Sequence, residues 1–314
     1  MVAATDNRNI GSFWIRHDSR RRKKYTYEPP GDFRAGKHEL GQYRVSLDKW
    51  EGITVREYGN LTRMEMEAID RKNTIVLIPI GALEQHGNQL PLATDDIIAE
   101  ETVAYIDREL DADFPILLFP LMPLGVSTEH MHFCGTVSLR PDTLYRMLYD
   151  ICTSLAQHGF VKIALLISHG SNIFQVLSRE LRSELGIGVF LINLTGLFGK
   201  PEVAATISPG NVFDFHGGEM ETSMVMAARP GLVKLDTAVS GKPVKYEGNK
   251  VLSYMGPISL GWIADEWRAA DGNPIGIGGD PRGATAEKGE IIFQSFARYV
   301  AQGLREIAAF DCSV

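Results

Sequence analysis

The chain has 314 residues, 44% of them hydrophobic, and a formal net charge of −7. It is long enough to bury a full core in one large domain or two, and its apolar fraction is ordinary for a soluble globular protein. No apolar run approaches the roughly 20 residues of a membrane-spanning helix, and the first residues lack the pattern of a secretory signal. The acidic balance argues against nucleic acid. We therefore expect a cytoplasmic protein with no membrane and no nucleic-acid partner.

The first 45 residues are polar and rich in Arg, Gly and Pro. They predict an N-terminal extension or arm before a single domain over residues 46–314. The basic run over residues 17–24 has two interpretations, a nucleic-acid patch or a solvated arm or subunit contact; because it is short and isolated, we favour the second. The three cysteines, Cys134, Cys152 and Cys312, form no disulfide or CxxC framework, which suits a reducing compartment.

Beyond the extension, short apolar runs alternate with longer amphipathic ones. In chain order they predict a helix over residues 61–72, a strand over 74–80, a helix over 95–110, a strand over 116–121, a helix over 141–159, a strand over 161–167, a helix over 172–185, a strand over 188–194, and helices over 219–228 and 285–304. This order predicts the α/β class, a layered sandwich with a mostly parallel central sheet flanked by helices. Residues 232–283 are loop-rich and predict an elaborated edge, a lid or an oligomer contact.

Potential metal ligands follow the strand over residues 74–80. Glu84, His86 and Asp95 come where a buried parallel strand ends, which is where open α/β sheets place their chemistry. Carboxylate and imidazole groups suit Zn²⁺, Mn²⁺ and Fe²⁺, and a carboxylate can bridge two cations about 3.5–4 Å apart. The alternative is a helix-capping Asp95 among surface polar residues. The combination favours ligands.

Two later segments carry similar residues. His169 follows the strand over residues 161–167, either as a ligand or in a turn with Asn172 as a helix cap. His216 is followed by Glu219 and Glu221, which would point to different faces of a helix. One of the two carboxylates can bind a metal while the other is solvated or caps the helix. His216 is either a general acid/base or a structural histidine.

Other candidates have weaker patterns. Glu129, His130 and His132 are either a second metal cluster or, as we favour, part of a substrate-facing loop. Cys134 lacks the partner motif of a nucleophile. The Gly-rich run over residues 277–289 is either a phosphate cradle or a turn with Thr285 as helix cap and Lys288 exposed. Because the run lacks the Walker spacing, we favour the turn.

Taken together, the motifs resemble the creatininase (creatinine amidohydrolase) superfamily over residues 60–305. They are Pro79-Ile80-Gly81-Ala82-Leu83-Glu84-Gln85-His86-Gly87, Thr94-Asp95, Glu129-His130, Phe133-Cys134-Gly135-Thr136, Ser168-His169-Gly170-Ser171-Asn172, His216-Gly217-Gly218, Glu221-Thr222-Ser223, Gly279-Asp280-Pro281 and Glu287-Lys288-Gly289. The resemblance implies a layered α/β fold, hydrolysis of amide-type carbon–nitrogen bonds, two divalent metal ions and a homo-oligomer, often a hexamer.

The resemblance also implies residue roles. Glu84 and His169 would hold one metal, His86 and Glu221 the other, and Asp95 would bridge them. His216 would transfer a proton. Substrate-binding residues would be Ser127, Glu129, His130 and Ser171.

Some positions differ from the creatinine-hydrolysing members. Those members carry Tyr and Glu where this chain has Gly170 and Ser171, Trp and Glu where it has Val212 and Phe215, and Pro in place of Cys134. We therefore expect a substrate other than creatinine: a cyclic amide, formamide or related small molecule, cleaved by a metal-bridging hydroxide. The alternatives are a mononuclear metallopeptidase and a non-catalytic homologue that binds a small molecule.

Overall fold

The computed structural model describes residues 56–170, 174–211, 213–254 and 257–313. The expected extension over residues 1–45, its basic run and the domain boundary lie outside the described residues and stay predictions. Within the described part of the chain, no helix is long and apolar enough to cross a membrane.

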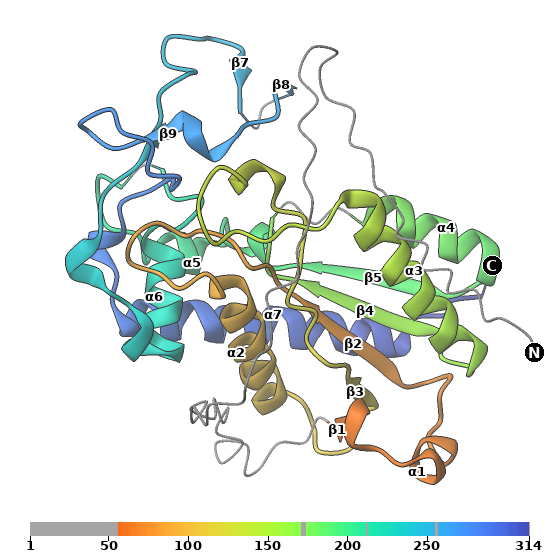
Figure 1. Cartoon of the computed structure of the whole chain (residues 1–314). Coiled ribbons are helices and arrows are strands. Elements are labelled where there is room, and N and C mark those ends of the chain that lie inside the picture. The colour runs from red at the N-terminus through yellow and green to blue at the C-terminus, as the bar shows by residue number, and fades with distance from the viewer. Residues whose placement is uncertain (1–55, 171–173, 212, 255–256, 314) are drawn as a thin grey trace, which may run out of the picture. The chain divides into compact units, whose positions relative to one another are not determined.

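The centre of the fold is a five-stranded sheet in the order β1-β3-β2-β4-β5 (Figure 1). All four strand pairings are parallel. Its strands are β1 (Arg56–Glu57), β2 (Ile75–Ile80), β3 (Ile116–Leu118), β4 (Lys162–Ile167) and β5 (Gly188–Asn193). The pairing of β2 with β4 runs from Ile75 opposite Lys162 to Ile80 opposite Ile167, so the two strands end at the same level.

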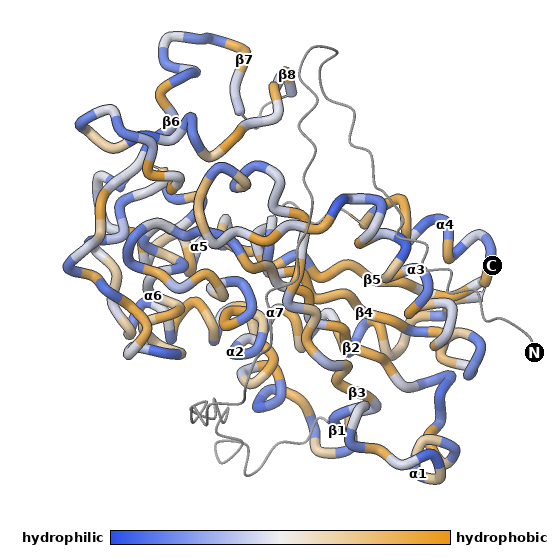
Figure 2. The backbone as a smooth tube through the Cα atoms, in the orientation of Figure 1, coloured by the Kyte–Doolittle hydropathy of each residue, from blue (hydrophilic) through white to orange (hydrophobic). Residues whose placement is uncertain are grey.

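Helices cover both faces of the sheet, which confirms the predicted layered α/β fold (Figure 1). One core combines Ile75 and Leu77 of β2 with residues of α2, α6 and α7, whereas the other combines Val76 and Ile78 with residues of α3 and α4. Figure 2 shows the resulting hydrophobic strands between the two layers. The helices are α1 (Arg63–Glu67), α2 (Thr94–Glu109), α3 (Pro141–Gln157), α4 (Gln175–Leu185), α5 (Pro201–Ala204), α6 (Glu219–Ala228) and α7 (Ala286–Ala309).

Central strands β2 and β4 are buried at every position. A strand covered by helices on both faces needs apolar residues throughout rather than alternation. This requirement explains why uninterrupted apolar runs predicted these two strands well.

Several predicted boundaries were wrong. The helix expected over residues 61–72 is confined to α1, which begins with a capping box between Thr62 and Glu65 and ends at Glu67, with Ala68 as its C-cap. Met64, assigned to its apolar face, is 73% exposed, so no continuous buried stripe supports a longer helix. The strand expected to reach residue 121 ends at Leu118, just before Pro120, which has no N–H to donate. Helix α7 extends five residues beyond the predicted end at 304.

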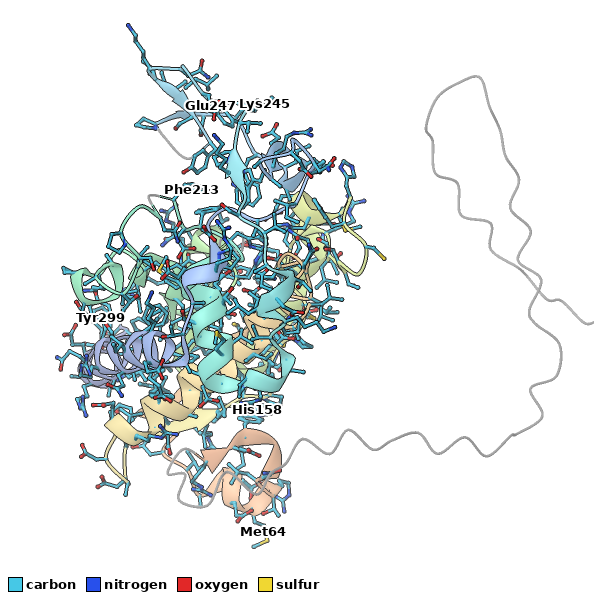
Figure 3. The ribbon with its side chains drawn as sticks, turned by 90° about the vertical axis from the view of Figure 1, so that its left-hand side faces the viewer. Met64, His158, Phe213, Lys245, Glu247 and Tyr299 are labelled. Atoms are coloured by element: carbon cyan, nitrogen blue, oxygen red, sulfur yellow. The ribbon has the colours of Figure 1, made fainter. Side chains whose placement is uncertain are left out.

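The segment over residues 232–283 is loop-rich, as expected. It contains 3₁₀ turns at Leu235–Thr237, Ala264–Glu266 and Pro281–Gly283 and the two-residue strands β6 (Lys242–Pro243), β7 (Leu252–Ser253), β8 (Ile258–Ser259) and β9 (Trp267–Arg268). Figure 3 shows Lys245 and Glu247 of this segment at the end of the domain opposite Met64. We call residues 232–283 the cover segment.

Candidate metal centre

The candidate site lies beyond the carboxyl ends of β2 and β4. Glu84 and His86 follow β2, Asp95 lies in the first turn of α2, and His169 comes two residues after β4. Glu221 reaches the same place from the first turn of α6, and His216 from the residues just before this helix. A Cβ at Gly81 would lie 2.0 Å from Asp96 Oδ1, so this glycine lets the start of α2 approach the chain that leaves β2. The fold therefore brings together the five predicted ligands and His216.

The first group of potential ligands consists of Glu84, Asp95 and His169. His169 Nδ1 lies 3.3 Å from Glu84 Oε1 and 3.7 Å from Asp95 Oδ2. The other ring nitrogen, Nε2, lies 2.8 Å from the carbonyl oxygen of Val126 and donates its proton there. Nδ1 therefore faces the two carboxylates. Burial lowers the pKa of His169, but the charges of Glu84 and Asp95 raise it to about 10, so a cation bound here would replace the Nδ1 proton and use its lone pair.

The second group consists of His86, His216 and Glu221. His86 Nε2 lies 3.7 Å from Glu221 Oε2 and 3.8 Å from Asp95 Oδ1. His86 Nδ1 donates to the carbonyl of Glu84 at 3.1 Å, which leaves Nε2 with a lone pair. The two oxygens of Asp95 thus face different histidines, one in each group.

The electrostatics of this cluster favour an added cation. Both carboxylate oxygens of Glu84, Asp95 Oδ2 and His86 Nε2 are buried without a hydrogen-bond partner in the described part of the chain. Burial, followed by the charge of Glu84, raises the pKa of Asp95 well above its usual value, and burial raises the pKa of Glu221 to about 8. Unpaired buried carboxylates are costly, and a divalent cation held by oxygen and imidazole donors would stabilise them.

His216 and His130 form a third grouping with Glu84. His216 Nε2 donates to the carbonyl of Gln85 at 2.9 Å, and its Nδ1 lies 3.6 Å from Glu84 Oε1. The ring of His216 lies 4.2 Å, centroid to centroid, from both His86 and His130. His130 is buried, with Nε2 3.6 Å from Glu84 Oε1. It therefore belongs to the centre as well as to the loop where sequence reasoning placed it.

Glu219 differs from both expectations for the second carboxylate of α6. It neither caps the helix nor faces solvent, because its side chain is 1% exposed and paired with Lys288. It also accepts hydrogen bonds from the backbone and hydroxyl of Ser208 and from Asn211. We call Ser208, Asn211, Glu219 and Lys288 the anchor cluster. Lys288, expected to be exposed, is three-quarters buried in it, whereas Thr285 caps α7 as predicted.

A cavity of about 460 Å³ opens onto the centre. Its wall includes the predicted substrate residues Glu129 and His130. Ser127 is fully buried and is not among the lining residues, while Ser171 lies outside the described residues. Lining residues that sequence reasoning missed are Thr195, Phe198, Asp214 and Trp262. Asp214 could have been found from its position two residues before His216, but Trp262 stands in the cover segment with no motif around it.

Comparison with known proteins places the chain in a family. The family described as creatinine amidohydrolase (creatininase) matches residues 59–304. A creatinine amidohydrolase from Pseudomonas putida is 27% identical over 79% of this chain and 95% of its own length. A mycofactocin precursor peptide peptidase from Mycolicibacterium smegmatis is 29% identical over 74% of this chain and 84% of its own length.

Solved creatininase structures share the fold. One described as creatininase with Mn has 25% identity and a TM-score of 0.65, and covers 80% of this chain and 98% of its own. A mutant of the Zn–Zn type has 26% identity and a TM-score of 0.64, covering 79% and 96%. The class these matches define is a hydrolase acting on carbon–nitrogen bonds. The chain belongs to the creatininase family.

Proposed function

We propose that the protein is an amidohydrolase with a two-metal centre. Glu84, Asp95 and His169 hold one divalent cation, and His86, Asp95 and Glu221 hold the other. The observation that carries this proposal is the position of Asp95, whose Oδ2 lies 3.7 Å from His169 Nδ1 and whose Oδ1 lies 3.8 Å from His86 Nε2. A carboxylate placed between two lone-pair nitrogens is suited to bridge two cations.

The charge of the site supports two cations rather than one. Glu84, Asp95 and Glu221 together carry −3 when ionised, and a neutral state of the histidines adds nothing. Two divalent cations and one hydroxide add a net charge of +3, which balances the three carboxylates. When bound, such a pair lowers the pKa of a bridging water towards neutrality and supplies hydroxide as the nucleophile. The solved relatives described with Mn and as the Zn–Zn type make Zn²⁺ and Mn²⁺ the metals to test, with Fe²⁺ as a third choice.

His216 is the proton-transfer group in this proposal. Its Nε2–H is held by the Gln85 carbonyl, so the Nδ1 lone pair faces the centre 3.6 Å from Glu84 Oε1. Burial lowers its pKa, which keeps the ring neutral and able to accept a proton. The same ring can then donate that proton to the leaving nitrogen of the amide.

The cavity supports a small-molecule substrate with an amide-type bond. Its volume of about 460 Å³ lies within the range of small-ligand pockets. Phe198, Phe215 and Trp262 provide an aromatic wall, and Glu129 provides an acidic group. Gly170 and Phe215 line the cavity where creatinine-hydrolysing members carry other residues, which supports a cyclic amide, formamide or related compound other than creatinine.

A metallopeptidase is the second candidate function, because one relative at 29% identity is described as a peptide peptidase.

We also propose a cytoplasmic homo-oligomer, a hexamer by analogy with the family, with residues 1–45 as an extension. Size-exclusion chromatography with light scattering tests the assembly, and a hexamer mass is expected.

Metal stoichiometry and a hydrolysis screen test the function. The stripped protein is reconstituted with Zn²⁺ or Mn²⁺, and bound metal is counted by mass spectrometry. We expect two equivalents, and amine or ammonia release from a panel of cyclic amides and formamides. One equivalent together with cleavage of short peptides would indicate the metallopeptidase instead. Fewer than one equivalent under every reconstitution condition contradicts both.

A further inference from the structure

Gln85 lies between the metal centre and the cover segment. Its side chain is buried, and the amide nitrogen Nε2 lies 2.6 Å from the carbonyl oxygen of Gly276 and 2.8 Å from His130 Nδ1. Gly276 has a φ of 73°, and a Cβ there would lie 2.6 Å from the Gln85 amide. A glycine at position 276 is therefore what allows the backbone of the cover segment to reach this side chain.

The orientation of the Gln85 amide is determined by two independent neighbours. The Gly276 carbonyl can only accept a hydrogen bond, so the atom facing it must be the NH₂ group. The other end, Oε1, accepts a hydrogen bond from the backbone N–H of Gly87 at 3.0 Å. Exchanging nitrogen and oxygen would make both contacts repulsive, so the amide presents a donor to His130.

This orientation determines the tautomer of His130. Because the Gln85 amide donates, Nδ1 of His130 has to accept, and the proton of the neutral ring is on Nε2. His216 Nε2 lies 3.4 Å from the same amide nitrogen, but its proton is directed to the Gln85 carbonyl. The backbone and side chain of one residue thus hold two histidines in opposite states, His216 with a lone pair toward the centre and His130 with an N–H.

We propose that Gln85 is a positioning residue that fixes His130 as a hydrogen-bond donor to the reacting substrate. His130 lines the cavity, and its Nε2 lies 3.6 Å from Glu84 Oε1, so its N–H lies at the cavity wall beside the proposed metal centre. The ring is held by the stacked His216 and by the edge contact with Trp262 at 5.6 Å. The inference rests on the proposed amide hydrolysis and adds a donor for the oxygen that gains negative charge.

The same assignment excludes His130 as a metal ligand. A ring nitrogen that carries a proton has no lone pair to give, whereas Nε2 of His86 has one and Nδ1 of His169 gains one when a cation replaces its proton. The grouping of Glu84, His130 and His216 is therefore not a third metal site, although its atoms lie within 4.8 Å of one another.

The tautomer is read directly by NMR of ¹⁵N-histidine-labelled protein, both metal-free and loaded with Zn²⁺. The His130 signals are identified by their loss in His130→Asn. We expect long-range ¹H–¹⁵N spectra to show a protonated Nε2 and an unprotonated Nδ1 in both states. A proton on Nδ1, or a metal-coordination shift on Nε2, would overturn the proposal.

Substitution of Gln85 tests its role. In Gln85→Glu the new carboxylate can only accept, so the His130 proton should move to Nδ1. The matched control is Gln89→Glu, because Gln89 is also buried and its described hydrogen bonds go to Gly217 and Thr222 and to no imidazole. If Gln85→Glu does not fold, Gln85→Met of similar length should give a mixture of tautomers. If His130 keeps its proton on Nε2 in the folded Gln85 variant, the proposal is contradicted.

Zinc content separates this inference from the proposed function. His130→Asn should bind as much zinc as the wild type, whereas His169→Asn should lose about one equivalent. Loss of zinc in His130→Asn overturns the donor role. Failure of the wild type to bind two metals contradicts the two-metal centre, but the tautomer measurement in the metal-free protein still decides the position of the His130 proton.

Discussion

Helix α6 carries two buried carboxylates in opposite situations, Glu219 in the anchor cluster and Glu221 in the candidate metal centre. Lys288, Ser208 and Asn211 surround Glu219, so that its pKa is lowered although burial alone would raise it. Glu221 accepts a hydrogen bond from Gly217 N at 2.6 Å, and burial raises its pKa to about 8. The comparison teaches that the protein neutralises one carboxylate with its own lysine, whereas the other lies beside histidines and carboxylates, where the proposed metal would neutralise it.

The largest expected effect comes from removing Asp95, the proposed bridging carboxylate. Asp95→Asn should lower zinc affinity by more than about a hundredfold, because even residues that only support metal ligands cost 10–100-fold. Hydrolysis should fall in parallel. The metal-free variant should nevertheless unfold at a higher temperature than metal-free wild type, because the amide replaces a carboxyl whose charged form is disfavoured by burial and then by the charge of Glu84.

Competition titration with a zinc indicator and thermal unfolding measure these two effects. Asp96→Asn is the matched control, since Asp96 is the neighbouring buried carboxylate and is in none of the three candidate groups. Zinc affinity of Asp95→Asn equal to that of the control would refute the bridge.

The anchor cluster should respond to the opposite change. Lys288→Met leaves Glu219 buried without its cation. This should lower the free energy of unfolding by about 3 kcal/mol. The value is at the low end of the range for a broken buried ion pair, because the Lys288 side chain is 24% exposed. Urea unfolding measures the loss, and the double variant with Glu219→Gln should recover most of it. Zinc content should not change. A loss below about 1 kcal/mol would place this pair with ordinary surface pairs.

Acidity should distinguish the metal-free from the metal-loaded protein. The pKa of Glu221 is about 8 in the folded chain against 4.5 for the free group. Its contribution to stability is therefore fully present below 4.5 and is lost as pH rises through 8. The metal-free protein should be less stable at about pH 8.5 than at about pH 6.

Zinc should weaken or reverse this trend, because metals bind the deprotonated ligands. Differential scanning fluorimetry at the two pH values measures both slopes. The variant Glu221→Gln should show a smaller loss between the two pH values without metal. If the metal-free wild type becomes more stable towards alkaline pH, the raised pKa of Glu221 is contradicted.

The smallest expected effect concerns the aromatic wall. Trp262 stacks on the buried Trp267 with ring centroids 4.3 Å apart, so its ring is held in place beside the cavity. Trp262→Ala should raise KM about tenfold for the amide found in the hydrolysis screen, as expected for the loss of one aromatic contact of about 1.5 kcal/mol. Zinc content should stay at the wild-type value. A fall in kcat with unchanged KM would assign Trp262 a different role.

The fold and the gathering of the centre could be predicted because both follow from local patterns. The apolar runs of β2 and β4 define buried parallel strands, and parallel strands end at one edge of a sheet. The structure indeed brings Glu84, Asp95 and His169 together at that edge. Their roles as metal ligands stay a prediction.

Other features depend on contacts between distant residues. The lowered pKa of Glu219 depends on Lys288, which lies 69 residues away. The tautomer of His130 depends on the carbonyl of Gly276, which orients the Gln85 amide. Trp262 reaches the cavity from the cover segment, whose short strands have no periodic pattern. Residues 61–72 show that a helical spacing of apolar residues does not produce a helix of the predicted length where tertiary packing does not bury those residues.

The sequence separation of the clustered side chains has a consequence for biosynthesis. Glu84 follows β2 and Glu221 lies in α6, so the two come together in a fold in which β4 pairs with β2 and α6 packs on the sheet. A nascent chain lacking α6 therefore presents an incomplete set of donors, and parallel sheets with distant contacts form slowly. Metal acquisition should follow folding rather than guide it. The metal present in the compartment when folding ends would then influence which ion the enzyme carries.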